Sequence, residues 1–417
     1  MEVKKGYKKT EVGIIPEDWS VATFGDVFNV SGGFSASRDQ LSQNGYCYLH
    51  YGDIHKSTKA YIDVQAEYVD IPKLDIPLQR ISSKSLLNDG DVVFVDASED
   101  DEGASRHIVV INKEDIPYIS GLHTIVVKSK GENINKGYRR YCFQTRDIKR
   151  QFYFYAVGTK VTGISKSNIV KIFLPLPSPS EQRAIAAALS DVDALINSLD
   201  RLIAKKRDLK HVAMQELLTG KRRQPGFGGE WEIKTLNDIT NCLDNFRVPL
   251  NDTQRSQMRG DYPYCGANGV LDYVNDYVID DDFILIAEDG GYFDEYEYRP
   301  IAYRMIGKCW VNNHAHILKT KEGFDQGFVF YSLVHKNILR FLASGTRAKL
   351  NKYEMFKIEI DIPLDAKEQT AIATVLSDMD AEITALEQRR NKTIALKQGI
   401  MQELLTGRIR LMKGNPA

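Results

Sequence analysis

Two long segments of the sequence carry apolar residues at spacings that alternate between four and three. This spacing is typical of the seam of a left-handed coiled coil. It predicts one long helix within residues 176–223 and a second within residues 365–411. The first apolar row is formed by Ile185, Leu189, Val192, Ile196, Leu199 and Ile203, and the second by Ile372, Leu376, Met379, Ile383 and Leu386.

The two predicted helices are copies of one another. Residues 181–220 align without gaps on residues 368–407, and 22 of the 40 positions are identical. The shared text opens with Glu-Gln and ends with Met-Gln-Glu-Leu-Leu-Thr-Gly. Chance does not produce such a match, so the chain contains an internal duplication. The length of the segments and their duplication also argue against the alternative that each is an ordinary core helix.

The first helix carries a further apolar row. Leu195, Leu202 and Leu209 follow one another at intervals of seven residues. A second row widens the apolar face of a helix. We therefore expect this helix to pack against more than its sister helix.

The residues before each helix predict two globular units of mixed α/β structure, within residues 1–175 and 224–364. Short runs of β-branched and aromatic residues between Asp and Gly turns are typical of strands. The expected strands are residues 91–95, 108–111, 124–127 and 283–287, and the expected shorter helices are residues 139–155 and 328–342.

Faint echoes relate the two globular units as well. The run from His123, His-Thr-Ile-Val-Val-Lys, resembles the run from His314, His-Ala-His-Ile-Leu-Lys. Phe-Tyr-Ala-Val-Gly-Thr-Lys at 154–160 resembles Phe-Leu-Ala-Ser-Gly-Thr-Arg at 341–347. The helices are thus copied closely, whereas the globular units have diverged.

Composition places the chain among ordinary globular proteins. Its 417 residues suggest two or three domains, and 43% of them are hydrophobic and 27% charged. No run approaches the 18 apolar residues of a membrane span, and the polar N-terminus does not resemble an export signal. The five cysteines are scattered without a Cys-x-x-Cys pair, which favours a reducing cytoplasm over a disulfide scaffold.

Charge alone does not indicate a nucleic-acid-binding protein. The formal net charge is −1, from 55 basic and 56 acidic residues. Residues 224–367 are acidic, with 16 basic against 22 acidic side chains. Any surface that binds nucleic acid must therefore be local.

Catalytic motifs are missing from the sequence. It has no phosphate-binding GxxxxGK[ST] loop, no GxGxxG, and no Asn/Asp-Pro-Pro-aromatic tetrapeptide of an amino methyltransferase. His314 and His316 alternate on a predicted strand, so their rings could share a face and bind a metal. Because no Cys or Asp lies at ligand spacing, we favour a structural role for them. We expect no catalytic residue and no bound metal in this chain.

Two groups of basic and small residues are candidates for phosphate contacts. Six cations lie within residues 136–150, and Gly-Thr-Lys or Gly-Thr-Arg follows at the equivalent place in each unit. Small residues let backbone N–H groups approach a phosphate, which a hydroxyl and a cation can then bind. The alternative, that Gly-Thr caps a helix, remains open. The candidates are Arg139, Arg140, Gly158, Thr159, Lys160 and Lys166, with Gly345, Thr346, Arg347 and Lys349 in the second unit.

Aromatic and amide residues are candidates for base contacts. An Asn side chain can form a bidentate pair with adenine, and Tyr and Gly suit irregular loops. A turn at the edge of a core explains such residues equally well. The candidates are Tyr46, Tyr48, His50 and Tyr51 in the first unit and Tyr262, Tyr264 and Asn268 in the second.

The order of these elements resembles the DNA-specificity subunit of type I restriction-modification systems. A diverged unit, a helix that opens with Glu-Gln, and a Gln-Glu-Leu-Leu-Thr-Gly ending occur twice, and the resemblance covers essentially the whole chain. It implies two target-recognition domains, each contacting one half of an interrupted sequence in double-stranded DNA. The two helices would pair antiparallel, space the domains and dock two methyltransferase subunits.

The same resemblance implies that the chemistry belongs to partner subunits. Adenine methylation with S-adenosylmethionine would be carried out by the modification subunits, and cleavage with ATP and Mg²⁺ by motor-nuclease subunits. Two alternatives remain open. One is a stand-alone DNA-binding regulator with twin domains, and the other is a self-sufficient methyltransferase, which the missing Pro-Pro motif disfavours.

Overall fold

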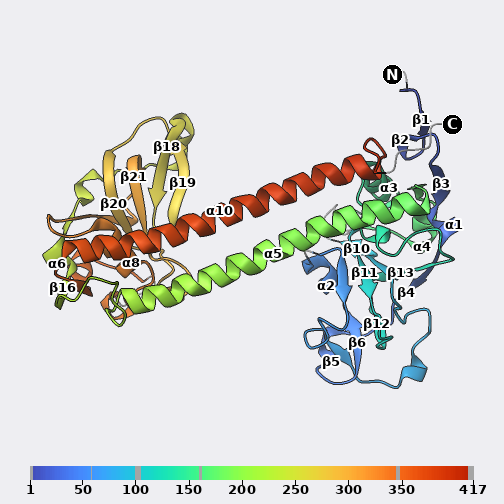
Figure 1. The fold of residues 1–417 in the computed structure, drawn as a ribbon, viewed down its shortest axis with the longest axis horizontal. Coiled ribbons are helices and arrows are strands. Elements are labelled where there is room, and N and C mark those ends of the chain that lie inside the picture. Colours follow the sequence, from blue (N-terminus) through green and yellow to red (C-terminus); the bar gives the residue numbers. More distant parts are fainter. Residues whose placement is uncertain (1–2, 58, 99–104, 159–161, 344–347, 412–417) are drawn as a thin grey trace. The chain divides into compact units, whose positions relative to one another are not determined.

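The computed structural model describes residues 3–57, 59–98, 105–158, 162–343 and 348–411. The chain forms two compact units, here called unit 1 (residues 1–198 and 390–417) and unit 2 (residues 199–389). The long helices are α5 (Pro179–Leu217) and α10 (Ala366–Leu405), and each contributes one part to each unit (Figure 1). Both lie inside the ranges predicted from the heptads. The division between the units falls within the two helices, at residues 198/199 and 389/390.

Local sequence explains where the helices begin and end. α5 begins at Pro179, whose fixed φ suits the first helical position. The Ser178 hydroxyl accepts a hydrogen bond from the Glu181 N–H, and the Asp365 carboxylate accepts one from the Lys367 N–H at the start of α10. After both helices the chain turns at a glycine with positive φ (68° at Gly220 and 69° at Gly407), a conformation that other residues rarely adopt.

The two helices run antiparallel, as the resemblance implied. In unit 2, Arg207 and Lys210 of α5 pair with Glu387 and Asp380 of α10, so residue numbers rise on one helix as they fall on the other. The predicted seam is at least half-buried throughout. Its buried members are Ile185, Leu189, Leu199, Ile203, Ile372, Leu376 and Ile383, and its half-buried members are Val192, Ile196, Met379 and Leu386.

The Glu-Gln motif that opens each helix also anchors a globular segment. Gln182 accepts a hydrogen bond from the Asn135 N–H at 2.8 Å in unit 1, and Gln369 accepts one from the Asp325 N–H at 2.8 Å in unit 2. Both amides also donate to the proline carbonyl that precedes their helix. The duplicated glutamine therefore makes the same connection twice, although the segments that it anchors have diverged.

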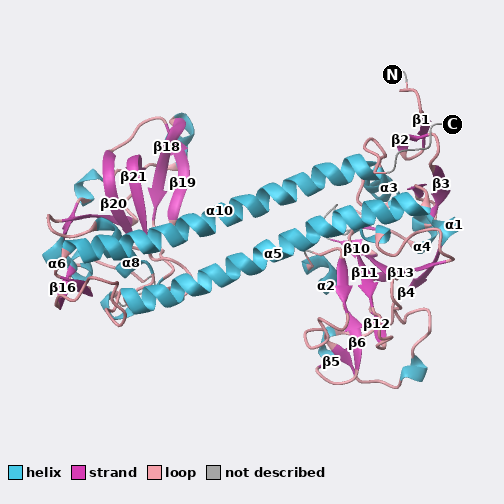
Figure 2. Cartoon of the chain, viewed as in Figure 1, coloured by secondary structure: helices cyan, strands magenta, loops and turns pink. Residues whose placement is uncertain are grey.

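Unit 1 is built around a five-stranded sheet with the order β4-β13-β9-β11-β7 (Figure 2). The central strand β9 is fully buried. Phe94 packs against Phe152 of α3 (Arg146–Tyr155) on one side of the sheet, and Val93 and Val95 pack into a second hydrophobic cluster on the other side. The strands are β4 (Phe28–Gly32), β13 (Thr124–Ser129), β9 (Val92–Val95), β11 (His107–Ile111) and β7 (Tyr61–Asp63). Three of them confirm predicted strands.

Smaller elements complete unit 1. A second sheet has the order β12-β6-β8-β5, with β12 (Tyr118–Ser120), β6 (Tyr46–Leu49), β8 (Lys73–Leu74) and β5 (Leu41–Ser42). The paired strands are β1 (Tyr7–Thr10) with β2 (Gly13–Pro16), β3 (Ser20–Thr23) with β15 (Phe173–Leu176), and β10 (Ala97–Ser98) with β14 (Thr162–Gly163). The short helices are α1 (Phe24–Val27), α2 (Tyr51–Lys56), α3 (Arg146–Tyr155) and α4 (Lys166–Ile169).

Unit 2 is built around a six-stranded sheet with the order β17-β22-β20-β21-β18-β19. The side chains of its central strand β20 also alternate between two buried faces. Ile284 and Ile286 pack into the hydrophobic cluster that includes α8 (Gln326–Val334), and Phe283 and Leu285 pack into a second hydrophobic cluster. The strands are β17 (Thr240–Cys242), β22 (Ala315–Thr320), β20 (Ile279–Ala287), β21 (Ala302–Val311), β18 (Arg259–Gly266) and β19 (Gly269–Val274). The others are β16 (Trp231–Thr235) with β23 (Glu359–Pro363), α6 (Leu236–Ile239), α7 (Asp252–Gln257), α8 (Gln326–Val334) and α9 (Lys352–Met355).

Both of the shorter predicted helices were placed too broadly. The stretch 139–155 is not one helix, because Thr145 is extended and its hydroxyl accepts the Ile148 N–H, so that α3 begins only at Arg146. Residues 138–140 form a separate 3-10 turn. The stretch 328–342 likewise ends as an α-helix at Val334. None of the described helices combines the length and apolar character that crossing a membrane requires.

Candidate nucleic-acid interface

In unit 1 three segments that are distant in sequence meet at the end of the central strand. The Asp96 N–H, directly after β9, donates to the His123 carbonyl at 3.1 Å, and the Ile164 N–H donates to the Asp96 carbonyl at 2.8 Å. We call this meeting point of Asp96, His123 and Ile164 junction 1. The predicted Gly-Thr-Lys segment leads directly into it, since β14 begins at Thr162.

Unit 2 repeats this arrangement with different residues. The Glu288 N–H, after β20, donates to the His314 carbonyl at 2.8 Å, and the Leu350 N–H donates to the Glu288 carbonyl at 2.7 Å. We call the meeting point of Glu288, His314 and Leu350 junction 2. The Gly-Thr-Arg segment precedes Leu350 as Gly-Thr-Lys precedes Ile164. The duplication has therefore preserved the backbone of the junction while its side chains diverged.

A histidine paired with a carboxylate lies at each junction. His123 Nδ1 lies 3.3 Å from Asp96, and His314 Nδ1 lies 2.6 Å from Asp289. Both imidazoles are open to solvent, with 50% and 42% of the side chain exposed. These histidines were not among the sequence-predicted contacts, although the similar runs from His123 and His314 would have identified them.

Two predicted base contacts lie beside the junctions. The half-buried Tyr51 ring is in edge contact with His123, at 5.4 Å between centroids, and packs on His50 at 4.5 Å. In unit 2 the exposed Asn268 donates to the carbonyl of Gly290, the residue after Asp289. The structure thus brings Tyr51 into contact with His123, and it ties Asn268 to the backbone one residue after Asp289, the partner of His314.

Two of the predicted phosphate contacts, Lys166 and Lys349, lie within two residues of a junction residue in the chain. Lys166 is exposed, and Lys349 lies 2.8 Å from Glu288 of junction 2. Gly158 has a positive φ of 142°, which suits glycine. Thr159, Lys160, Gly345, Thr346 and Arg347 lie outside the described residues.

Three predicted contacts are corrected because their side chains belong to the core. The Tyr48 hydroxyl donates to the Phe34 carbonyl at 2.8 Å, and the Tyr264 hydroxyl accepts the Leu250 N–H at 3.0 Å; both rings are buried. Arg139 is also buried, donates to the carbonyls of Gly90 and Ile134, and has its pKa lowered by that burial. In this fold none of the three can reach DNA.

Three other candidates occupy intermediate positions. Tyr46 packs half-buried in the second sheet of unit 1, and the Arg140 guanidinium lies over the Tyr61 ring. Tyr262 is half-buried against Tyr277, at 5.3 Å between centroids. None of these side chains lies in contact with a junction histidine in the described residues, so their role in DNA binding remains a prediction.

A network of charged and hydrogen-bonding side chains connects to junction 2 through Glu288 and the Leu350 carbonyl. His316 is buried, and its ring nitrogens lie 2.7 Å from the Asp244 carboxylate and 2.9 Å from the Leu350 carbonyl. Both partners can accept a hydrogen bond, so each ring nitrogen is placed where it can donate one. Burial raises the pKa of Asp244, but its bonds to His316 outweigh this and lower the pKa to about 2. Arg247 joins the network through Asp244 and Glu288.

Part of this network contains residue types that bind metal ions. The ligand atoms of Cys242, Asp244 and His316 lie within 4.8 Å of one another. A cation there would have to displace the protons of His316 and approach Arg247, whose guanidinium lies 3.1 Å from Asp244. The residues therefore fit a hydrogen-bonded network better than a metal site.

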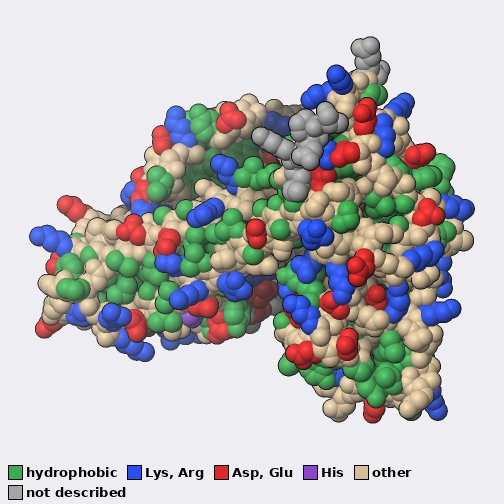
Figure 3. All heavy atoms as spheres, turned by 45° about the vertical axis from the view of Figure 1, so that its right-hand side comes forward, with side chains coloured by type: hydrophobic (Ala, Val, Ile, Leu, Met, Phe, Trp, Pro, Cys, Tyr) green, Lys and Arg blue, Asp and Glu red, His purple; other side chains and the backbone are tan. Residues whose placement is uncertain are grey.

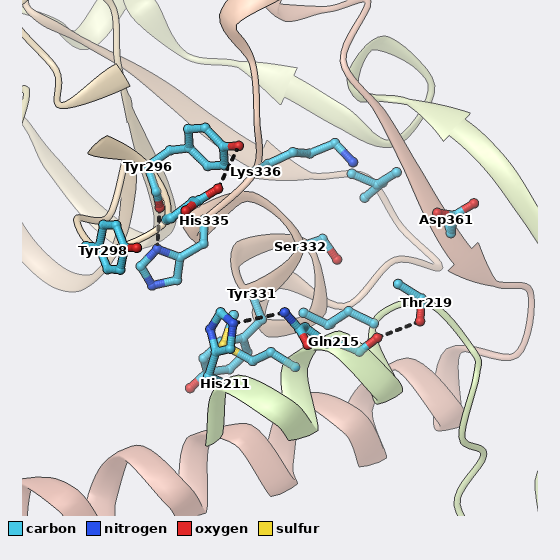
Figure 4. Close-up of a pocket in the computed structure, with 14 residues that line it drawn as sticks. His211, Gln215, Thr219, Tyr296, Tyr298, Tyr331, Ser332, His335, Lys336 and Asp361 are labelled. Atoms are coloured by element: carbon cyan, nitrogen blue, oxygen red, sulfur yellow. Dashed lines mark hydrogen bonds between the residues drawn. The ribbon is translucent and has the colours of Figure 1, made fainter. Parts of the chain in front are cut away.

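Unit 2 also contains a pocket of about 540 Å³ between the C-terminal turns of α5, α8 and β23 (Figure 4). His335 Nδ1 donates to the Tyr296 carbonyl, and the amide of Gln215 lies 2.9 Å from His211 Nε2. Neither histidine is held by a carboxylate in the described structure. The pocket therefore lacks the pairing that marks both junctions.

The distribution of surface charge agrees with the near balance of basic and acidic residues in the sequence. On the face drawn in Figure 3, Lys and Arg side chains lie among Asp and Glu side chains instead of forming one basic area. On this face, contacts to nucleic acid would therefore have to come from local groups of cations.

Comparisons with known protein sequences all point to the specificity proteins of type I restriction-modification systems. The sequence profile described as "Type I restriction modification DNA specificity domain" matches residues 16–205 and 228–396. Over 154 residues the chain is 38% identical to a Haemophilus influenzae protein described as a type I restriction enzyme specificity subunit, covering 37% of the chain and 38% of that relative. It is 26% identical to the MjaX specificity subunit of Methanocaldococcus jannaschii, covering 98% of the chain and 97% of the relative.

Solved structures share the fold. The crystal structure of the type I restriction-modification S subunit from M. genitalium superposes with a TM-score of 0.60 at 14% identity, covering 97% of this chain and 98% of that one. A chain from a structural study of assembly in the type I system gives a TM-score of 0.56 at 15% identity, covering 95% and 99%. At these identities the likeness concerns architecture alone.

Proposed function

The chain belongs to the type I restriction-modification DNA specificity family, and from this we propose that it is the sequence-specific DNA-binding subunit of such a complex. Each unit would contact one half of a bipartite target in double-stranded DNA. The observation that carries this proposal is the repetition of the junction. Two diverged units place different side chains on the same backbone frame, as two readers of different half-sites require.

We further propose that catalysis belongs to partner subunits. The support for this is that the sequence lacks the motifs expected of a methyltransferase or an ATP-dependent motor. Methylation with S-adenosylmethionine and cleavage with ATP and Mg²⁺ are therefore assigned to modification and motor-nuclease subunits. Purified chain without partners should transfer no labelled methyl group to DNA, and methyl transfer by the isolated protein would contradict the assignment.

The helices offer a surface for such partners. Leu195, Leu202 and Leu209 on α5 remain 39–47% exposed. Their seven-residue spacing puts them on one side of the helix, which fits a helical partner. Co-purification from cells that express the neighbouring genes tests this. A chain that binds its DNA target but captures no methyltransferase subunit would support the alternative of a stand-alone regulator.

The decisive test of the two-reader proposal is an exchange of one unit. Residues 1–175 are replaced by the equivalent segment of a relative with a different target, while both helices are kept. We expect sequencing of methylated sites in the assembled complex to show one half-site changed and the other retained. Alteration of both halves would contradict independent recognition.

A further inference from the structure

The carboxylate-paired histidines of the two junctions share one chemical property. An ionised carboxylate only accepts hydrogen bonds, so Asp96 and Asp289 fix the proton of His123 and His314 on Nδ1. In the neutral ring Nε2 is then an acceptor. Neither Nε2 has a hydrogen-bond partner among the residues that the structure describes, and both rings are about half exposed.

From this geometry we propose that His123 and His314 are matched base-contacting residues, one in each half-site. Nε2 of each would accept a hydrogen bond from an exocyclic amino group, that of adenine or cytosine, in the major groove. Asp96 and Asp289 act as positioning residues that hold the tautomer. This inference rests on the proposed function, because it names the residues through which each unit would recognise its half-site.

A base is a better partner for these rings than a phosphate. Phosphate oxygens only accept, so a neutral Nε2 acceptor cannot bond to them. An amino group carries the donor that Nε2 lacks.

The surroundings of the rings support a role in specificity. Tyr51 packs against His123, and Asn268 donates to the carbonyl of Gly290, the residue after Asp289. A side chain that could contact a base therefore touches His123 in unit 1, and another is bonded to the backbone one residue from the partner of His314 in unit 2. These neighbours differ between the units, whereas the histidine and its carboxylate recur. Each junction therefore combines a shared acceptor with its own neighbouring side chain.

The test uses His314→Asn and His123→Asn in the assembled methyltransferase complex. The asparagine amide can replace Nδ1 and keep the bond to the carboxylate, but it leaves no atom at Nε2. His314→Gln is the companion variant, because its longer amide reaches the position of Nε2. His211→Asn is the control, since His211 is an exposed histidine on α5 that lies 2.9 Å from the Gln215 amide and pairs with no carboxylate among the described residues.

Binding is measured on duplex libraries randomised over both half-sites. We expect His314→Asn to lose about five- to tenfold of the preference at one base pair of one half-site, and His123→Asn at one base pair of the other. His314→Gln should retain part of the preference, and His211→Asn all of it. The unaffected half-site shows in each case that the complex is folded.

Three outcomes would overturn the inference. The first is an unchanged base preference at every position. The second is a uniform weakening of DNA binding with a salt slope smaller by about one, which indicates a phosphate contact. The third is a loss of preference at both half-sites from a single variant. Failure of the proposed function looks different, because the unmodified complex would then show no bipartite preference at all.

Discussion

Arg410, beyond the end of α10, forms a two-pronged ion pair with Glu181 in the first turn of α5, with Nε 2.5 Å from Oε1 and Nη2 2.8 Å from Oε2. The indole N–H of Trp19 donates to the same carboxylate at 2.9 Å. The copied residues repeat the pair in unit 2, where Arg223 binds Glu368. Each helix start is thus held by the tail that follows the other helix.

Loss of the arginine should destabilise unit 1 strongly. Glu181 is only 1% exposed, so Arg410→Met leaves a buried carboxylate without its counter-charge, which costs about 3 kcal/mol. Unfolding in urea, followed on the full chain, measures the loss. Arg408→Met is the control, because Arg408 pairs with Glu403 at the surface and its loss should cost less than about 1 kcal/mol. Equal losses in the two variants would refute the role of burial.

The sequence was informative where structure depends on local pattern and failed where it depends on distant contacts. The heptads and the duplication are periodic, so α5, α10 and their seam were predictable. Thr145 divided a predicted helix because its hydroxyl caps α3, a choice that helix propensity alone does not reveal.

The site was predictable only in part. Tyr48 and Tyr264 have the composition of contact residues, yet distant backbone groups bind their hydroxyls in the core. Junction histidines were missed as contacts because each junction joins three segments far apart in the chain. A single sequence does not place Asp96 beside His123, although the repeated runs pointed to His123 and His314.

Acid should weaken unit 2 through Asp244. Its folded pKa of about 2 lies below the ordinary value of 3.8, so the stability that it contributes is present above pH 4 and is lost as pH falls toward 2. The shift corresponds to about 2 kcal/mol. Between pH 5 and pH 2 the free energy of unfolding should therefore fall by about 2 kcal/mol less in Asp244→Asn than in the natural chain, as measured by chemical unfolding at each pH. An identical fall in the two proteins would contradict the ion pair with His316.

The Gly-Thr-Lys and Gly-Thr-Arg segments remain predicted phosphate contacts. Lys160→Ala and Arg347→Ala should weaken binding to every DNA sequence alike and reduce the salt slope by about one each. Titrations at several salt concentrations measure this, with Lys357→Ala as the control because Lys357 is an exposed lysine that pairs with Glu354. Loss confined to one base position would instead identify a base contact.

Lengthening both helices tests whether they set the spacing of the half-sites. One heptad is inserted after residue 198 of α5 and another after residue 389 of α10, where unit 1 and unit 2 divide, so that the contacts within each unit are retained. A whole heptad also keeps the apolar seam in register. Each helix becomes about 10 Å longer, which corresponds to about three base pairs at 3.4 Å each.

Three base pairs also rotate the half-sites by about 100°, since one turn takes 10–10.5 pairs. The DNA or the helix pair must absorb this twist, so affinity should fall even where the longer target is accepted. Mapping of methylated sites in the complex decides the matter. We expect both half-sites to be retained with a gap about three base pairs longer, whereas an active complex with the original gap would show that the helices do not determine the spacing.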